Sequence, residues 1–247
     1  MKRLNNALFV FVALLFIFGI AFAAEGSNRK IDGYVQVVDG CEVVLSGCLN
    51  VRLGPGTGFK KTHVLRIGAI VKVDKEIEDK NGRPWYRIKQ DSPLSYPERA
   101  QGDWYVAAEH TIWVNVPSEP RVDAKKKIVV DLSEQKLYAY ESDKIMIESA
   151  VSTGIRGAET SKGEFKILYK KPSRYMQCPL PGMTDYCDFP GVPWAMFFTW
   201  DGAALHGAPW HNDFGKKRSH GCVNLPIDKA EWLYRWATVG TKVIVTD

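Results

Sequence analysis

The chain has 247 residues, of which 45% are hydrophobic and 25% charged, and its formal net charge is +5 at pH 7. This length and composition can bury ordinary globular cores in one or two domains, and they exclude a disordered or low-complexity chain. The small charge excludes the strongly basic face of a typical nucleic-acid-binding protein, so nucleic acid is not expected as a partner.

The first segment is typical of a secretory signal peptide. Basic Lys2 and Arg3 precede an apolar run from Ala7 to Ala24, and an Ala-Phe-Ala sequence ending at Ala23 has the small residues of a cleavage site. We therefore expect residues 1–23 to be removed and the protein to be exported to the periplasm or cell wall. The alternative is an uncleaved anchor, because eighteen apolar residues are about the shortest spanning helix. Only then would the membrane be a partner.

Short β-prone runs at residues 70–73, 85–88 and 104–106 follow, separated by turns rich in Gly, Pro and Asn-Gly. This pattern predicts a small all-β barrel without a convincing helix. Residues 50–59, with the sequence NVRLGPGTGF, resemble the opening of bacterial SH3-like domains. The resemblance covers residues 34–115, and it implies a targeting or spacer module for the cell wall.

A boundary between two domains is expected at residues 116–125. Pro117 and Pro120 interrupt the hydrophobic pattern there, together with polar residues. The remaining segment, residues 126–247, is long enough to fold alone.

Residues 126–247 also have mainly the pattern of β-strands. Apolar runs at 128–132 and 136–140 flank a polar turn, which predicts a hairpin. A helix is expected at 226–237, because Pro226 suits a first turn and apolar residues recur on one face. Further strands are predicted, and their ranges are 145–151, 163–169, 194–200, 203–205 and 242–245.

The most informative motif lies in this second segment. It consists of a His-Gly pair followed thirteen residues later by a six-residue run. A free thiol is mostly protonated at pH 7, so a nucleophilic cysteine needs a base, and imidazole is the usual one. Glycines allow backbone N–H groups to approach a substrate oxygen closely. The motif residues are His206, Gly207, Ser219, His220, Gly221, Cys222, Val223 and Asn224.

This motif resembles the signature of the L,D-transpeptidase (YkuD-type) family. The resemblance implies that Cys222 is the acylated nucleophile and that His206 is its base, oriented by the carbonyl of Gly207. It also implies that Ser219, His220, Gly221 and Asn224 shape the loop, with backbone N–H groups around Gly221 and Cys222 receiving the oxyanion. Two features depart from the family pattern, namely the short interval between His206 and Cys222 and the insert at residues 210–214.

The function implied by the resemblance is peptidoglycan cross-linking. Cys222 would attack the carbonyl before the terminal D-Ala of a donor stem peptide, and the amine of a neighbouring stem would resolve the thioester. Water in place of the amine would make the protein an L,D-carboxypeptidase. No metal or organic cofactor is implied, and carbapenem-type inhibitors are expected to acylate the cysteine. An inactive cell-wall-binding protein is the alternative from another functional class.

Two other site types fit parts of the motif. His206, His211, His220 and Cys222 carry side chains that bind zinc, but their spacing matches no paired zinc knuckle. A papain-like or NlpC/P60-type peptidase also pairs cysteine with histidine. In those families, however, the cysteine precedes its histidine by many residues, whereas here the order is reversed.

The cysteine count is odd, which predicts one unpaired thiol in an exported chain. The motif assigns that thiol to Cys222. The short spacing within the two remaining pairs favours the local disulfides Cys41–Cys48 and Cys178–Cys187, and free buried thiols are the alternative. Residues 175–193, rich in Pro, Gly and aromatic residues, are expected to form either a substrate flap or a plain surface loop.

Overall fold

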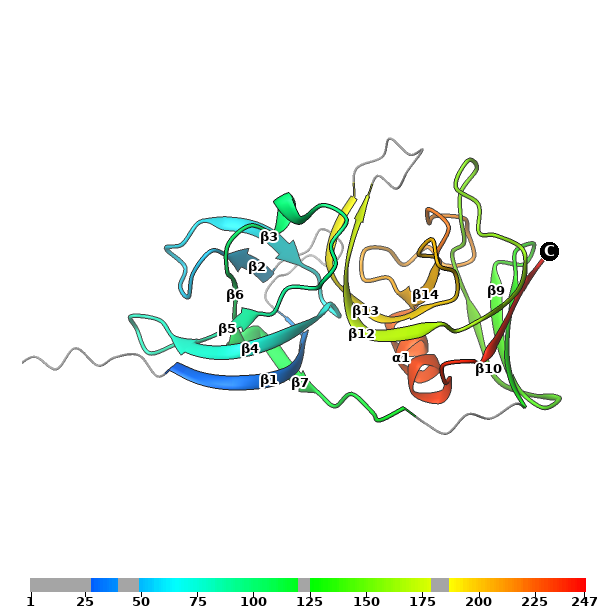
Figure 1. Ribbon diagram of the computed structural model, residues 1–247, viewed down its shortest axis with the longest axis horizontal. Coiled ribbons are helices and arrows are strands. Elements are labelled where there is room, and N and C mark those ends of the chain that lie inside the picture. Colours follow the sequence, from blue (N-terminus) through cyan, green and yellow to red (C-terminus); the bar gives the residue numbers. More distant parts are fainter. Residues whose placement is uncertain (1–27, 40–48, 120–124, 179–186) are drawn as a thin grey trace, which may run out of the picture.

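The computed structural model describes residues 28–39, 49–119, 125–178 and 187–247 (Figure 1). The predicted signal peptide at 1–23 lies outside the described residues, as do Cys41 and Cys48. Across the described part of the chain, no helix is both long and apolar enough to cross a membrane.

The first seven strands form one antiparallel sheet with the order β3-β2-β6-β5-β4-β1-β7. Its side chains form a core of their own around Trp104, Val51 and Val73. The structure thus contains a seven-stranded sheet in this part of the chain, and the SH3-like assignment stays a prediction. The elements are β1 (Asn28–Val37), β2 (Leu49–Arg52), β3 (Lys61–Leu65), β4 (Ile70–Glu78), β5 (Pro84–Ile88), β6 (Trp104–Ala107), β7 (Thr111–Val114) and the short 3-10 helices η1 (Pro97–Ala100) and η2 (Ala108–His110).

Among the described residues of the second half, the strands form two sheets and one α-helix packs against them. One sheet has the order β10-β9-β8-β16-β11 and the other the order β12-β13-β14-β15. The prediction of a mainly β fold with few helices is confirmed. The elements are β8 (Lys126–Asp131), β9 (Lys136–Glu141), β10 (Lys144–Ala150), β11 (Gly163–Lys166), β12 (Tyr169–Cys178), β13 (Cys187–Phe197), β14 (Ala204–Gly207), β15 (Val223–Leu225), α1 (Ile227–Trp236) and β16 (Lys242–Thr246).

Helix α1 covers one face of the four-stranded sheet. Its buried Ala230, Leu233 and Tyr234 lie on one side of the helix, and the ring of Tyr234 lies 5.1 Å from that of Trp194 in β13. The buried core of this half includes Leu137 from the five-stranded sheet and side chains from β13 and β14. The apolar residues whose spacing predicts the helix therefore form the face that packs into this core.

Residues 175–193 are expected to form a substrate flap or a surface loop, but the described residues of this segment, 175–178 and 187–193, belong to strands β12 and β13. β12 and β13 pair antiparallel up to Cys178 and Cys187, and these two cysteines form a disulfide. Successive side chains of a strand point to opposite faces. Accordingly, Tyr175 packs into the core of the first sheet, whereas Met176 packs toward Cys222.

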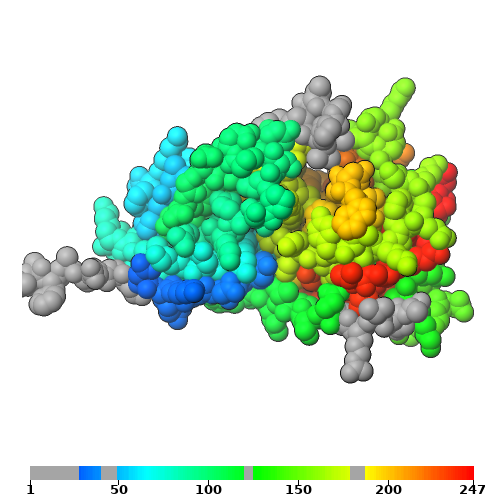
Figure 2. All heavy atoms as spheres, in the orientation of Figure 1, coloured from blue at the N-terminus to red at the C-terminus, as the bar shows by residue number. Residues whose placement is uncertain are grey.

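The same hairpin contacts β3 and β4 of the first sheet, so the two halves of the chain lie side by side (Figures 1 and 2). Asp188 bonds His63 Nε2 at 2.9 Å through Oδ2 and accepts the Tyr175 hydroxyl at 2.5 Å through Oδ1. Ile70 of β4 belongs to the core of the second half. The halves therefore share buried contacts, and their division at residues 116–125 stays a prediction.

Candidate active site

The site is built where β14 and β15 run parallel. Leu205 pairs with Val223 and His206 with Asn224. Leu205 and Val223 point into the core, so His206 and Asn224 project from the opposite face. Cys222, directly before β15, packs against Ala204, which lies on the same face of β14 as His206. The register thus places the cysteine and the histidine on one side of two adjacent strands.

The cysteine lies in a small apolar cluster on that face. Cys222 is partly exposed and packs against a cluster formed by Ala195, Phe197 and Ala204, with Met176 beside it. Alternation along β13 separates Ala195 and Phe197 from the side chains that enter the core. The thiol therefore has an apolar wall on one side.

His206 is suited to act as a neutral base. Its side chain is only 2% exposed, and its Nδ1 lies 2.9 Å from the carbonyl oxygen of Gly207. That carbonyl can only accept, so Nδ1 carries the proton and the lone pair lies on Nε2. Burial lowers the pKa of His206 to about 4, with a smaller contribution from the charge of His211. The imidazole is therefore neutral at pH 7.

The thiol is protonated at rest. Burial raises the pKa of Cys222 to about 11, the negative charge of Asp201 adds to this effect, and the backbone N–H of Ala204 opposes it. The sulfur lies 4.0 Å from the carbonyl oxygen of Gly202, to which the thiol donates weakly. A neutral thiol can attack a carbonyl only if its proton moves to a base during the attack, and a neutral imidazole on the same face of the sheet has the lone pair to accept it.

Residues 152–160 hold the cysteine loop in place. Ser152 exchanges two backbone hydrogen bonds with Asn224, each 2.9 Å long. Gly154 is required here, because a Cβ at this position would lie 2.1 Å from the carbonyl oxygen of Ala158. Thr160 accepts the N–H of Gly154 at 2.9 Å. This brace sets the position of the strand that follows Cys222.

The other predicted residues lie within the same loop. Ser219 is buried and its hydroxyl donates to the carbonyl of Cys222. Gly221 has a φ of +106°, which L side chains rarely adopt, so glycine suits the turn before the cysteine. His220 is partly buried directly before it. The structure thus brings all of these residues to one loop.

The insert at residues 210–214 contributes to the site in a way that the motif does not indicate. His211 Nε2 lies 3.1 Å from Asn224 Nδ2, and the ring of Trp210 lies 5.6 Å from that of His206. Phe189 of the hairpin stacks on Trp210 at 4.3 Å. The sequence pattern indicates His211 only as a zinc ligand. In the sequence, only the Trp-His pair at the start of the insert could have indicated that His211 belongs to the site.

Two polar atoms here are buried without a hydrogen-bond partner. They are Asn224 Oδ1 and His211 Nδ1.

Within the described residues, no group of three or more His, Cys, Asp or Glu side chains is arranged to hold a metal ion. The structure therefore does not support the zinc alternative.

Comparisons with known proteins agree on one family. Residues 125–245 match the YkuD family model, the L,D-transpeptidase catalytic domain. The chain is 29% identical over 124 residues to L,D-transpeptidase 1 of Mycobacterium tuberculosis, a match that covers 47% of this chain and 49% of the relative. The chain thus spans about half the length of this curated relative.

Solved structures of the same kind are also similar. An L,D-transpeptidase from Mycobacterium smegmatis matches with a TM-score of 0.49 and 20% identity, over 88% of this chain and all of that chain. The catalytic domain of an E. faecium L,D-transpeptidase acylated by ertapenem matches with a TM-score of 0.45 and 26% identity, over 51% of this chain and all of that chain. From the family match and the curated relatives, the second half of the chain is an L,D-transpeptidase catalytic domain.

Proposed function

We propose that this protein is an exported peptidoglycan L,D-transpeptidase that acts through an acyl-enzyme on Cys222. The observation that carries the proposal is the parallel register of β14 and β15, which places Cys222 and His206 on one face within a matched catalytic domain. A buried, neutral imidazole on the same face as a protonated thiol is the resting state from which a coupled proton transfer and attack can begin.

In the first half-reaction, Nε2 of His206 accepts the thiol proton as the sulfur attacks the carbonyl carbon before the terminal D-Ala of a donor stem. The bond between sulfur and carbon forms, and the oxyanion is received by the backbone N–H groups of Gly221 and Cys222. The Gly207 carbonyl accepts a hydrogen bond from Nδ1–H and so stabilises the imidazolium. The tetrahedral intermediate then expels D-Ala, whose amine takes the proton from His206.

In the second half-reaction, the side-chain amine of a neighbouring stem attacks the thioester. His206 removes a proton from that amine, the bond between sulfur and carbon breaks, and the leaving thiolate takes this proton back from His206. Water in place of the amine would release the shortened stem, which is L,D-carboxypeptidase activity. Ser219, His220 and Asn224 hold the loop in which these steps occur.

The remaining parts of the proposal concern delivery to the wall. Residues 1–23 direct export, and residues 34–115 act as an SH3-like module that keeps the enzyme near peptidoglycan. Support comes from the sequence pattern of both segments. The contacts of the hairpin with β3 and β4 indicate that the first half also braces the catalytic site.

The first test is the intact mass of the purified protein after exposure to a carbapenem. We expect one acyl adduct in the wild type and none in Cys222→Ala. A lack of any adduct on correctly folded wild-type protein would refute the acyl-enzyme.

Cross-linking of purified muropeptides then separates the two histidines. We expect His206→Ala to remove cross-linking, because the base is lost, and His220→Ala to reduce it less severely, because His220 shapes the loop. If His206→Ala kept near-normal turnover and His220→Ala showed none, the assignment of the base would be reversed. Release of D-Ala without cross-links would identify a carboxypeptidase instead.

A further inference from the structure

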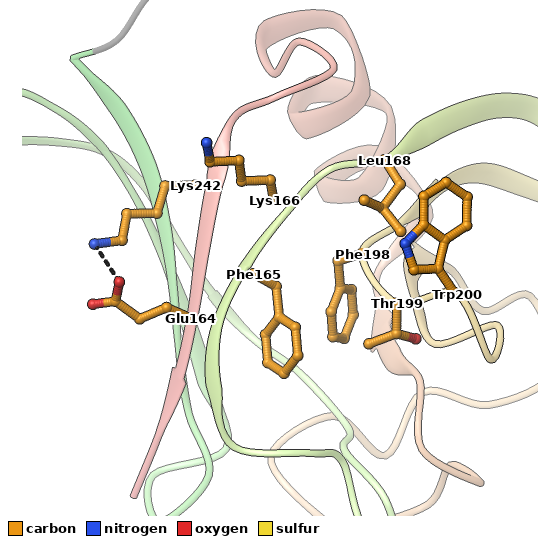
Figure 3. A pocket seen from close by; sticks show the side chains of 8 residues that line it. All are labelled: Glu164, Phe165, Lys166, Leu168, Phe198, Thr199, Trp200 and Lys242. Atoms are coloured by element: carbon orange, nitrogen blue, oxygen red, sulfur yellow. Dashed lines mark ion pairs between the residues drawn. The ribbon is translucent and has the colours of Figure 1, made fainter.

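A groove of about 710 Å³ lies beside the turn that follows β13 (Figure 3). Its floor is apolar and includes Phe165 of the edge strand β11, Leu168 and Phe198. The rings of Phe165 and Phe198 pack edge to face, with centroids 5.4 Å apart. This groove is separate from the apolar cluster around Cys222. Phe198, directly after β13, packs into the core, whereas Phe197 packs into the cluster around Cys222 on the other face.

The indole of Trp200 stands at one side of this groove and is 85% exposed, more than any other large hydrophobic side chain of the described residues. Exposing so large an apolar face to water gives no stability to the fold. A free aromatic face at a groove is instead suited to stack against a flat, partly apolar ligand surface.

The rim of the groove adds polar groups at several points. Lys242 and Glu164 form an ion pair of 2.8 Å, and Lys166 lies nearby (Figure 3). The Thr199 hydroxyl, also on the rim, accepts the backbone N–H of Ala203 at 2.8 Å and keeps its own proton for donation. Such groups can donate to and accept from hydroxyls and acetamido groups. An aromatic platform edged by hydrogen-bonding side chains matches a pyranose ring, which has an apolar C–H face and a polar circumference.

The groove is close to the reactive sulfur. Trp200 precedes Gly202 by two residues, a separation of at most about 7 Å along the chain. The carbonyl oxygen of Gly202 lies 4.0 Å from the Cys222 sulfur. One short turn therefore connects the aromatic platform to the thiol.

We propose that this groove binds an N-acetylated sugar ring of the glycan strand that carries the donor stem peptide. The inference rests on the proposed function and names a second contact of the same substrate. In the donor stem, three residues separate the glycan from the carbonyl that Cys222 attacks. Three extended residues span about 10 Å, which is comparable to the reach of about 7 Å from Trp200 to Gly202 together with the 4.0 Å from Gly202 to the sulfur.

The test compares a disaccharide-tetrapeptide with the sugar-free tetrapeptide. In wild-type protein we expect kcat/KM for the disaccharide-tetrapeptide to be about tenfold higher, equivalent to about 1.4 kcal/mol. Trp200→Ala should bring the ratio of the two constants close to one, whereas Trp200→Phe should retain part of it. Ile145→Ala removes another exposed large apolar side chain of the same half, from β10 at the opposite edge of the five-stranded sheet, so it is the matched control and should keep the wild-type ratio.

A second measurement does not depend on chemistry. Calorimetric titration of the Cys222→Ala protein with both compounds should show the same preference as a ratio of Kd values, and adding Trp200→Ala should remove it. A preference that survives Trp200→Ala would overturn the sugar site, as would equal affinities in the presence of Trp200. Failure of wild-type protein to process either compound would refute the proposed function, and the ratio of Kd values alone would then decide the sugar site.

Discussion

The burial of His206 predicts a specific loss of stability in acid. The folded protein holds its pKa at about 4, and the unfolded chain restores the ordinary value of 6.5. Between these values the unfolded state binds a proton that the folded state does not. The stability that His206 contributes is therefore complete above pH 6.5 and is lost as the pH falls toward 4. From pH 6.5 to pH 5 the loss is about 2 kcal/mol, at 1.36 kcal/mol for each unit.

Cys222 provides the opposite case in alkali. Its folded pKa is about 11 against an ordinary 9.0, so the unfolded chain loses its proton first as the pH rises. The stability contributed by this thiol is complete below pH 9 and falls by about 1 kcal/mol by pH 10. The two side chains thus act on opposite limbs of the stability curve.

Urea unfolding at pH 5, 7.5 and 10 measures both effects. His206→Gln removes the imidazole, so it should lose about 2 kcal/mol less than wild type between pH 7.5 and pH 5, while its alkaline loss stays. Cys222→Ala should show the reverse pattern and serves as the matched control. An acid loss in His206→Gln equal to that of wild type would refute the argument that burial holds this imidazole neutral.

Three further outcomes are expected. Under non-reducing conditions, a maleimide should label one thiol in the native exported protein, Cys222, whereas labelling of three or five thiols would contradict the two local disulfides. Gly154→Ala should lower the free energy of unfolding by about 1 to 3 kcal/mol and slow acylation, because its Cβ would meet the carbonyl of Ala158; unchanged melting and acylation would show that the brace is dispensable. A fragment covering residues 125–247 should have its unfolding midpoint at a lower urea concentration than the full chain, because Tyr175 loses its buried contacts with the first sheet. Equal unfolding midpoints would show that these contacts do not stabilise the hairpin.

The sequence alone determines the features that depend on local pattern. The hairpin at 128–140 and the helix near 226–237 follow from apolar spacing, and the structure confirms both. The motif around His206 and Cys222 predicts the reacting groups from residue type and spacing, and these roles stay a prediction. The catalytic family follows from that motif, and the family match over residues 125–245 agrees with it.

The tertiary structure decides features that depend on residues far apart in the chain. The three-residue strand β15 is too short for a periodic signal, yet its pairing with β14 places Cys222 on the same face as His206. The contact between His211 and Asn224 likewise has no local signal. Both features form only in the folded chain, when β14 and β15 lie side by side.

The hairpin of β12 and β13 shows why sequence pattern was insufficient. Its Pro and Gly residues indicate a loop, but its strands pair with each other and contact the first sheet. One face of the hairpin therefore packs on the first sheet and the other lies toward Cys222. Asp188 contacts His63 across 125 residues of sequence, and Tyr175 enters a core formed by the other half of the chain. Local propensity is weak relative to such burial and hydrogen bonding, and the partners that supply them become neighbours only in the folded molecule.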